Sequence, residues 1–180
     1  ASATAGVSGY STSGTGTIPV QTISTTGTTQ GTVTYAITPT AAGCAGTVAN
    51  YTVLVNPLPS VSSSATGTIC SAVAQNYSIT STVSGTTYSW SRALVSGISN
   101  AAVSGQTSNP ITETLVNTTS APVNVIYLIT PSANGCAGSV FTYTVTVNPT
   151  PSVTNSPLTQ TICSGASTTL VTLTSNVAGA

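Results

Sequence analysis

Apolar and small polar residues alternate at every second position through much of the chain. The clearest run is 140–147, where Phe141, Tyr143, Val145 and Val147 are separated by threonines. A period of two predicts a β-strand with one buried and one solvated face. The same pattern predicts further strands at 60–68, 76–83, 87–91, 111–116 and 124–130.

These short segments are joined by stretches rich in Gly, Ser and Asn, which favour turns. Helix formers at helical spacing are missing, whereas β-branched residues are abundant. The pattern therefore predicts an all-β protein with an immunoglobulin-like sandwich of about six or seven strands. From the alternation we expect the core to include Trp90, Tyr127, Tyr143 and Val145.

An internal repeat organises these strands. The blocks at 35–39, 43–46 and 55–61 recur at 127–131, 135–138 and 147–153, each displaced by 92 positions. The block at 68–71 recurs at 161–164, displaced by 93 positions. A period of this length is too long for a solenoid turn and suits one small β-sandwich module.

The Asn-Pro-x-Pro segments at 56–59 and 148–151 are interpreted as module boundaries, because proline cannot donate to a central ladder and stiffens a short connector. We therefore predict that residues 57–148 form one complete module. Residues 1–56 would be the later part of a preceding module, and residues 149–180 the opening of the next.

Composition excludes several classes of function. The chain has one basic residue, Arg92, one acidic residue, Glu113, and no histidine. Acid–base catalysis needs titratable partners, and calcium needs clustered carboxylates, so we expect no enzyme, no catalytic residue, no cofactor and no metal. One Arg cannot support nucleic-acid binding, and no apolar run is long enough for membrane insertion. Arg92 and Glu113 themselves are interpreted as two solvated surface charges, since Gln21 occupies the earlier repeat's position for Glu113.

Each module contributes two cysteines, at 70 and 136 in the complete one and at 44 and 163 in the partial ones. If strands simply run up and down, Cys70 and Cys136 meet at one end, so we expect them to form a disulfide. Cys44 and Cys163 would then pair with cysteines outside this sequence. Four buried free thiols are the alternative. Regular disulfides would place the chain in an oxidising, extracellular compartment.

Three tyrosines, Tyr10, Tyr51 and Tyr143, could line a glycan-binding surface, but at least the last two lie on the apolar stripe and are interpreted as sheet residues. Asn50, Asn76 and Asn117 head Asn-x-Ser/Thr sequences, which we expect to be unused in a bacterium.

The blocks at 88–90, 97–99, 115–119, 129–131, 135–136, 143–149 and 161–165 together resemble the PKD-like, Ig-like repeats of giant surface proteins of Bacteroidota. The resemblance covers nearly the whole chain. It implies a stalk segment of a cell-surface adhesin, gliding-motility adhesins included, exported by the type IX secretion system. It supplies no catalytic or ligand-binding residues.

Three hypotheses of function follow. The first is a structural repeat that spaces adhesive parts from the cell, with neighbouring repeats of the same chain as its partners. The second is a subunit of an extracellular filament, in which identical chains complete a module by strand addition, although the strand matching 87–91 is in neither end fragment. The third is a carbohydrate-binding module with surface glycans as partners. It would need a coplanar, exposed set of aromatic residues, and one Trp with alternating tyrosines is a weak sign of that; loss of glycan binding in Trp90→Ala would support it.

Overall fold

The structure is a computed structural model that describes residues 1–179, and all regular structure in that range is β-strand. The prediction of an all-β, immunoglobulin-like fold is confirmed. The strands are short, and several segments that complete the layers make only single bridges with their neighbours.

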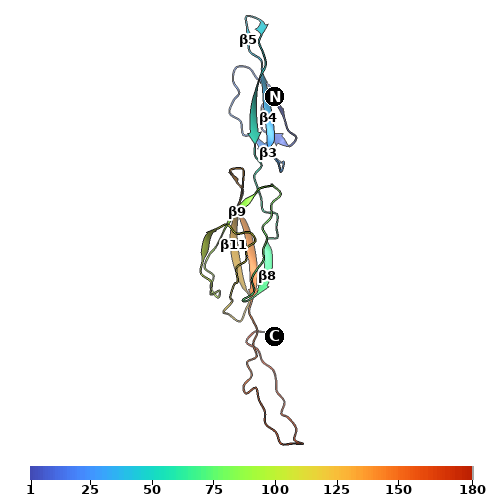
Figure 1. Cartoon of the computed structure of the whole chain (residues 1–180), viewed down its shortest axis with the longest axis vertical. Coiled ribbons are helices and arrows are strands. Elements are labelled where there is room, and N and C mark those ends of the chain that lie inside the picture. Colours follow the sequence, from blue (N-terminus) through green and yellow to red (C-terminus); the bar gives the residue numbers. More distant parts are fainter. Residues whose placement is uncertain (180) are drawn as a thin grey trace. The chain divides into compact units, whose positions relative to one another are not determined.

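Residues 1–56 form a three-stranded antiparallel sheet in the order β1-β4-β7, with β1 at Ser2–Ala3, β4 at Gly31–Ile37 and β7 at Ala49–Val55. Figure 1 shows β4 with its long partner β7 alongside, paired over the full length of both strands. Two smaller pairs complete this part. They are β2 (Val7–Ser8) with β3 (Ser24–Thr25), and the hairpin of β5 (Thr40–Ala41) with β6 (Cys44–Ala45).

The following residues form a six-stranded sheet in the order β10-β9-β11-β13-β8, with β12 paired to β11. Its strands are β8 (Thr66–Cys70), β9 (Thr87–Arg92), β10 (Val103–Gln106), β11 (Val123–Ala133), β12 (Cys136–Ala137) and β13 (Phe141–Asn148). β8 runs parallel to β13, from Thr66 beside Thr144 to Cys70 beside Asn148. The strands β4 to β7 therefore recur as β11 to β13, 92 positions later.

The second layer is made of extended segments held by bridges. Tyr77 and Ile111 exchange both backbone hydrogen bonds, and Ala74 bridges Thr114. Ile98 bridges Asn117 on the other side of the same segment. Residues 57–148 thus contain a sheet and an opposing layer, which is the arrangement that two amphipathic layers need to bury one face each.

The predicted strands at 87–91, 124–130 and 140–147 are present as β9, β11 and β13, whereas those at 76–83 and 111–116 are not continuous strands. The segment 76–83 changes partner along its length, pairing with Ile111 at Tyr77 and with Val61 at Ser81. The predicted strand at 60–68 is likewise divided between a bridge at Val61 and the start of β8. Strand β10 was not predicted, because its sequence lacks apolar alternation.

The core is formed by the alternating apolar residues of β11 and β13 and by those of the bridged segments. Trp90 and Tyr143 are 4% and 3% exposed, and Tyr127 and Val145 are fully buried. Trp90 packs edge-on against Tyr127, with ring centroids 5.7 Å apart. The four residues expected in the core therefore lie there.

By contacts the chain divides into two compact units. The first contains residues 1–63, 79–88 and 130–141, and the second contains residues 64–78, 89–129 and 142–180. The division falls within the residue ranges of β9, β11 and β13. The module boundaries at residues 56 and 148 stay predictions.

Candidate functional site

The two charged side chains form an ion pair in which Arg92 is buried and Glu113 is half-buried, its side chain 19% exposed. Arg92 Nε donates to Glu113 Oε2 at 3.0 Å, and Arg92 Nη2 donates to Glu113 Oε1 at 2.9 Å. Arg92 is 1% exposed, and its Nη2 also donates to the carbonyl oxygen of Ala101 at 2.7 Å. The interpretation of two solvated surface charges is therefore wrong. Arg92 lies two positions after Trp90 on β9, so both side chains leave the strand on its buried face.

Tyr127 and Gln75 extend this pair into a network. The Tyr127 hydroxyl donates to Glu113 Oε2 at 2.6 Å, and Gln75 Nε2 donates to the Tyr127 hydroxyl oxygen, also at 2.6 Å. Burial raises the pKa of Tyr127, and the hydrogen bond to Glu113 raises it further. Burial by itself would raise the pKa of Glu113, but the hydrogen bonds from Arg92 and Tyr127 outweigh it and lower that pKa. At neutral pH the tyrosine is protonated and the glutamate is ionised.

The groups of this network are engaged with one another. The Glu113 carboxylate accepts hydrogen bonds from Arg92 at both of its oxygens and from the Tyr127 hydroxyl at one of them. A general acid or base needs a pKa near the working pH, and the shifts at Glu113 and Tyr127 move both pKa values away from neutrality. The cluster instead joins β9, β11 and the two bridged segments through their side chains.

A neutral version of the same contact occurs in the first repeat. Tyr35, 92 positions before Tyr127, donates its hydroxyl to Gln21 Oε1 at 2.8 Å. Gln21 Oε1 also accepts the backbone N–H of Ser11 at 2.6 Å. In both repeats the core tyrosine therefore donates to a side-chain oxygen, an amide oxygen in the first and a carboxylate oxygen in the second.

Gln75 and Asn117 were not predicted as core polar residues. Asn117 is 7% exposed; its Nδ2 donates to the carbonyl oxygens of Ala121 and Val147, both at 2.8 Å, and its Oδ1 accepts from Thr119. This saturated amide is not available as a glycan acceptor. Asn117 heads a sequon and stands within the block 115–119, and neither pattern indicates burial. Gln75 stands in no pattern that would indicate burial, because a single polar residue in a β-rich segment looks like any solvent-exposed position.

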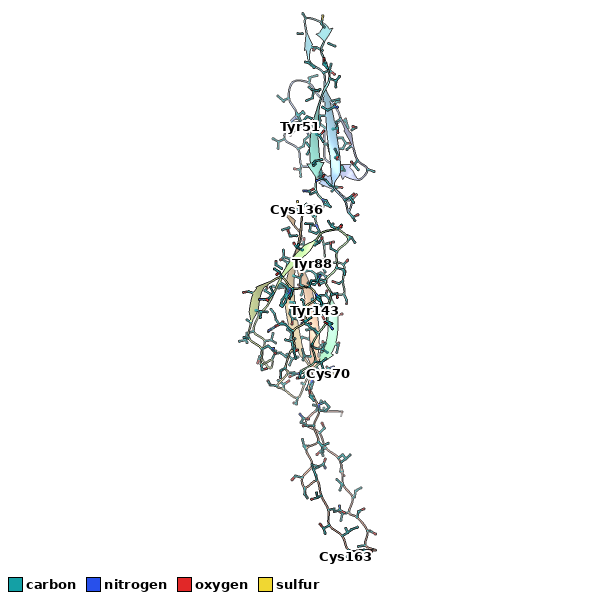
Figure 2. The ribbon with its side chains drawn as sticks, in the orientation of Figure 1. Tyr51, Cys70, Tyr88, Cys136, Tyr143 and Cys163 are labelled. Carbon is teal, nitrogen blue, oxygen red and sulfur yellow. The ribbon has the colours of Figure 1, made fainter. Side chains whose placement is uncertain are left out.

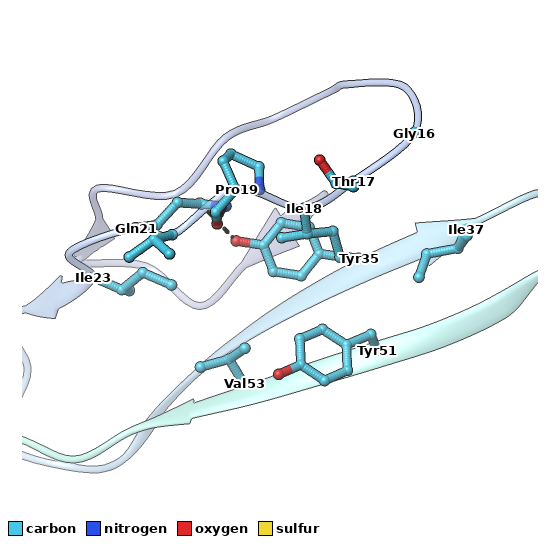
Figure 3. A pocket seen from close by; sticks show the side chains of 11 residues that line it. Gly16, Thr17, Ile18, Pro19, Gln21, Ile23, Tyr35, Ile37, Tyr51 and Val53 are labelled. Carbon is cyan, nitrogen blue, oxygen red and sulfur yellow. Dashed lines mark hydrogen bonds between the residues drawn. The ribbon is translucent and has the colours of Figure 1, made fainter.

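An open groove lies on the first repeat, with a volume of about 670 Å³. Figure 3 shows Tyr35 and Tyr51 facing it from β4 and β7, with Ile18 and Pro19 on the opposite side. Tyr51 is 54% exposed, whereas its repeat counterpart Tyr143 is 3% exposed. Tyr51 is a residue of strand β7, as its interpretation as a sheet residue required, but it is more exposed than a core or half-buried residue. Tyr143 is instead covered by Tyr77, whose ring stacks on it with centroids 3.6 Å apart.

The segment that would cover such a groove is present at the other end of the chain. Val153 bridges Ser175 as Val61 bridges Ser81 in the complete module. Leu173 stands two positions before Ser175, as Ile79 stands two positions before Ser81, so Leu173 is the counterpart of Ile79. Leu173 is 76% exposed and Ile79 is 3% exposed. The chain thus exposes an apolar groove in its first repeat and an apolar segment in its last.

All four cysteines are free thiols, so the expected Cys70–Cys136 disulfide is wrong. Cys70 is aligned with Asn148, the last residue of β13, whereas Cys136 precedes the first residue of that strand. Eight residues of strand span about 25 Å, and a disulfide needs Cα atoms within about 7 Å. Figure 2 labels Cys70, Cys136 and Cys163. The error arose because β8 is parallel to β13 and not part of an up-and-down order.

The aromatic residues do not form an exposed platform around Trp90. The indole is 4% exposed, and its Nε1 donates to the carbonyl oxygen of Ser108 at 2.9 Å. Tyr143 is buried and Tyr10 is half-buried. A carbohydrate-binding site with Trp90 as its stacking surface is therefore contradicted.

The strands and their opposing bridged segments define an immunoglobulin-like β module. A family model for the PKD-like domain matches residues 1–59 and again residues 67–151. The chain belongs to the PKD-like domain family, whose members are typically extracellular structural modules. No curated protein matches the chain. Among residues 1–179 there is no helix that could span a membrane and no group of three or more potential metal-ligating residues.

Proposed function

We propose that this chain is a structural repeat segment of a long extracellular bacterial adhesin or stalk, which spaces adhesive parts from the cell surface. Following the resemblance of its sequence blocks, the parent is a giant Bacteroidota surface protein of the kind exported by type IX secretion, which includes gliding-motility adhesins. The proposal is supported by the repeat, by membership of the PKD-like family and by charges that are used inside the fold.

The observation that supports the proposal best is the packed connector. Pro57 and Pro59 are buried, and the Cα of Gly138 lies against the carbonyl oxygen of Pro59 so closely that no Cβ would fit. Asn56 Nδ2 donates to the carbonyl oxygen of Asn134 at 3.2 Å. All of these residues belong to one compact unit. A proline connector held by such contacts resists bending, and a spacer requires that stiffness.

Small-angle scattering on chains with one, two or three extra copies of residues 57–148 tests the mechanical role. The maximum dimension should grow by a constant increment with each copy. Replacing both connector prolines, Pro57 and Pro59, with glycine in every junction should shorten the mean dimension without unfolding the modules. If the maximum dimension instead grows by less with each added copy, as it does for a compact particle, the stalk is contradicted.

Cell-surface exposure is tested separately. Antibodies raised against this chain should label intact cells of the source bacterium, and external protease should remove the signal. In a strain that lacks type IX secretion the antigen should remain inside the cell. Labelling that requires permeabilised wild-type cells would contradict the proposed location.

A second candidate is a filament that grows by strand addition, and the groove with its matching segment favours it. β7 is the last strand of its sheet, and the complete module places β8 beside the corresponding strand β13. Residues 159–163 are the counterpart of β8. In this candidate, residues 149–180 of a second copy lie along β7 and insert Leu173 into the groove.

Light scattering distinguishes the two candidates. The filament requires mass that rises with concentration, and it requires this rise to disappear in Leu173→Ser. Leu170 is 93% exposed and three positions away, on the opposite face of an extended segment, so Leu170→Ser is the matched control and should not change the assembly. A monomer at all concentrations would exclude the filament and leave the stalk.

A further inference from the structure

The two cysteines of a module occupy opposite ends of its sheet, and each lies beside a junction. Cys70 is paired in register with Asn148, and the next residue, Ser71, donates its backbone N–H to the carbonyl oxygen of Asn148 at 2.8 Å. Asn148 is the residue before the connector proline Pro149. The cysteine that ends β8 therefore lies next to the last residue of its own module.

The other cysteine lies where the preceding module ends. Asn56, the repeat counterpart of Asn148, donates through Nδ2 to the carbonyl oxygen of Asn134 at 3.2 Å. The Cys136 thiol sulfur is 3.9 Å from that same oxygen. Asn56, Asn134 and Cys136 belong to one compact unit. The final asparagine of one repeat and the Gly-Cys hairpin of the next thus contact one carbonyl group.

The hairpin presents its cysteine in the same way in both repeats. Asn134 and Gly135 adopt φ values of 50° and 79°, and their counterparts Ala42 and Gly43 adopt 48° and 83°. The bridge Ala133–Cys136 recurs as Ala41–Cys44. This left-handed turn fixes where the cysteine lies on its hairpin. We therefore take the position of Cys136 beside Asn56 as the arrangement at the other junctions too.

We propose that the cysteine ending β8 in each repeat forms a disulfide with the Gly-Cys hairpin cysteine of the following repeat. Cys70 would bond to the hairpin cysteine of the repeat after it, and Cys136 to the β8-type cysteine of the repeat before it. The β8-type cysteine lies one strand spacing from the asparagine, about 5 Å, and that asparagine touches the hairpin of Cys136.

The bond needs an oxidant, which we assign to the class of protein or small-molecule disulfides. One thiolate attacks the oxidant disulfide and forms a mixed disulfide; the second thiolate then displaces the oxidant as its dithiol. Two protein thiols lose two protons and two electrons in total, and the oxidant gains both. Cys70 is exposed and Cys136 is half-buried, so both are accessible to this exchange.

The test uses the full chain with one extra copy of residues 57–148 inserted after Asn148, so that every junction keeps its Asn-Pro sequence. In the junction variant, only Cys70 of the first copy and Cys136 of the inserted copy remain, and the other cysteines become serine. The matched control keeps Cys70 and Cys136 of the same copy. Both are equilibrated with oxidised and reduced glutathione, alkylated and analysed by mass spectrometry.

We expect the junction variant to lose both free thiols into one intramolecular disulfide and the control to retain both. Free thiols in the junction variant, or equal crosslinking in the control, would overturn the proposal. The emission of buried Trp90 shows whether each variant is folded. If either is unfolded, peptide mapping of the extended chain with all its cysteines decides: a Cys70 peptide linked to the same copy's Cys136 peptide, or left free, overturns the bond. The inference depends on tandem repetition and not on adhesion, so its failure would leave the stalk proposal standing.

Discussion

At the scale of single residues, Arg92 and Glu113 are structural side chains and not solvated surface charges. In a chain with one basic and one acidic residue, the two are hydrogen-bonded to each other, with Arg92 buried and Glu113 half-buried. A buried ion pair adds little net stability over an apolar pair of the same shape, but breaking it leaves one charge without a partner. The pair therefore makes the module sensitive to single substitutions at Arg92 or Glu113.

Glu113→Gln should destabilise the complete module by about 3 kcal/mol, because it leaves the guanidinium of Arg92 buried without its counter-charge. Urea unfolding followed by Trp90 fluorescence measures this change. The double variant Arg92→Met with Glu113→Gln is the control and should recover most of the loss, since neither charge then remains. A single variant as stable as the unaltered chain would show that the pair is solvated.

The same carboxylate predicts the acid stability of the protein. The pKa of Glu113 is lowered in the fold, so its contribution is present above the unfolded pKa, about 4.3, and is lost as the pH falls through the folded pKa. Glu113 is the only acidic side chain. The free energy of unfolding should therefore decline below about pH 4 in the unaltered chain, while in Glu113→Gln only the terminal carboxyl group remains to titrate. Parallel pH profiles would contradict this assignment.

At the scale of elements, the orientation of β8 decides where the cysteines lie and how the connector packs. β8 runs parallel to β13. The connector that precedes β8 contains the buried prolines Pro57 and Pro59. Gly138 follows the Gly-Cys hairpin and lies against the carbonyl oxygen of Pro59. Its repeat counterpart Gly46 faces only Pro39, whose Cγ would be 3.0 Å from an added Cβ.

These two glycines allow a matched test. Gly138→Ala should cost about 1–3 kcal/mol, because its Cβ overlaps a backbone atom that cannot move without shifting the connector. Gly46→Ala should cost clearly less, because the end of a proline ring can move by the few tenths of an ångström required. Thermal unfolding of the two variants measures the difference. Equal losses would mean that the connector does not pack against the hairpin.

At the scale of the whole molecule, the protein has almost no charge to regulate. It contains no lysine and no histidine, and the salt bridge found among residues 1–179 involves an arginine side chain with no exposed area. Salt screens exposed charges much more strongly than buried ones.

We expect the unfolding midpoint to be nearly unchanged between low salt and about 0.5 M sodium chloride, where the Debye length falls below about 5 Å. Electrophoretic mobility should stay near zero from about pH 5 to 7, since no side chain titrates there without a strong shift. Urea titrations at several salt concentrations and electrophoretic light scattering test both statements. A marked salt dependence would place the ion pair at the surface.

The sequence by itself determined the fold class, the repeat and the core face of β9, β11 and β13, because alternation and internal duplication are local patterns that survive without coordinates. The tertiary structure alone decided three things. They are which predicted strands are reduced to isolated bridges, that Arg92 binds Glu113 inside the fold, and which end of the sheet each cysteine occupies. These depend on strand order and direction, which involve residues far apart in the chain. Parallel pairing of β8 with β13 leaves no recognisable pattern in either strand's sequence, so the sequence could not show that Cys70 lies beside Asn148 and away from Cys136.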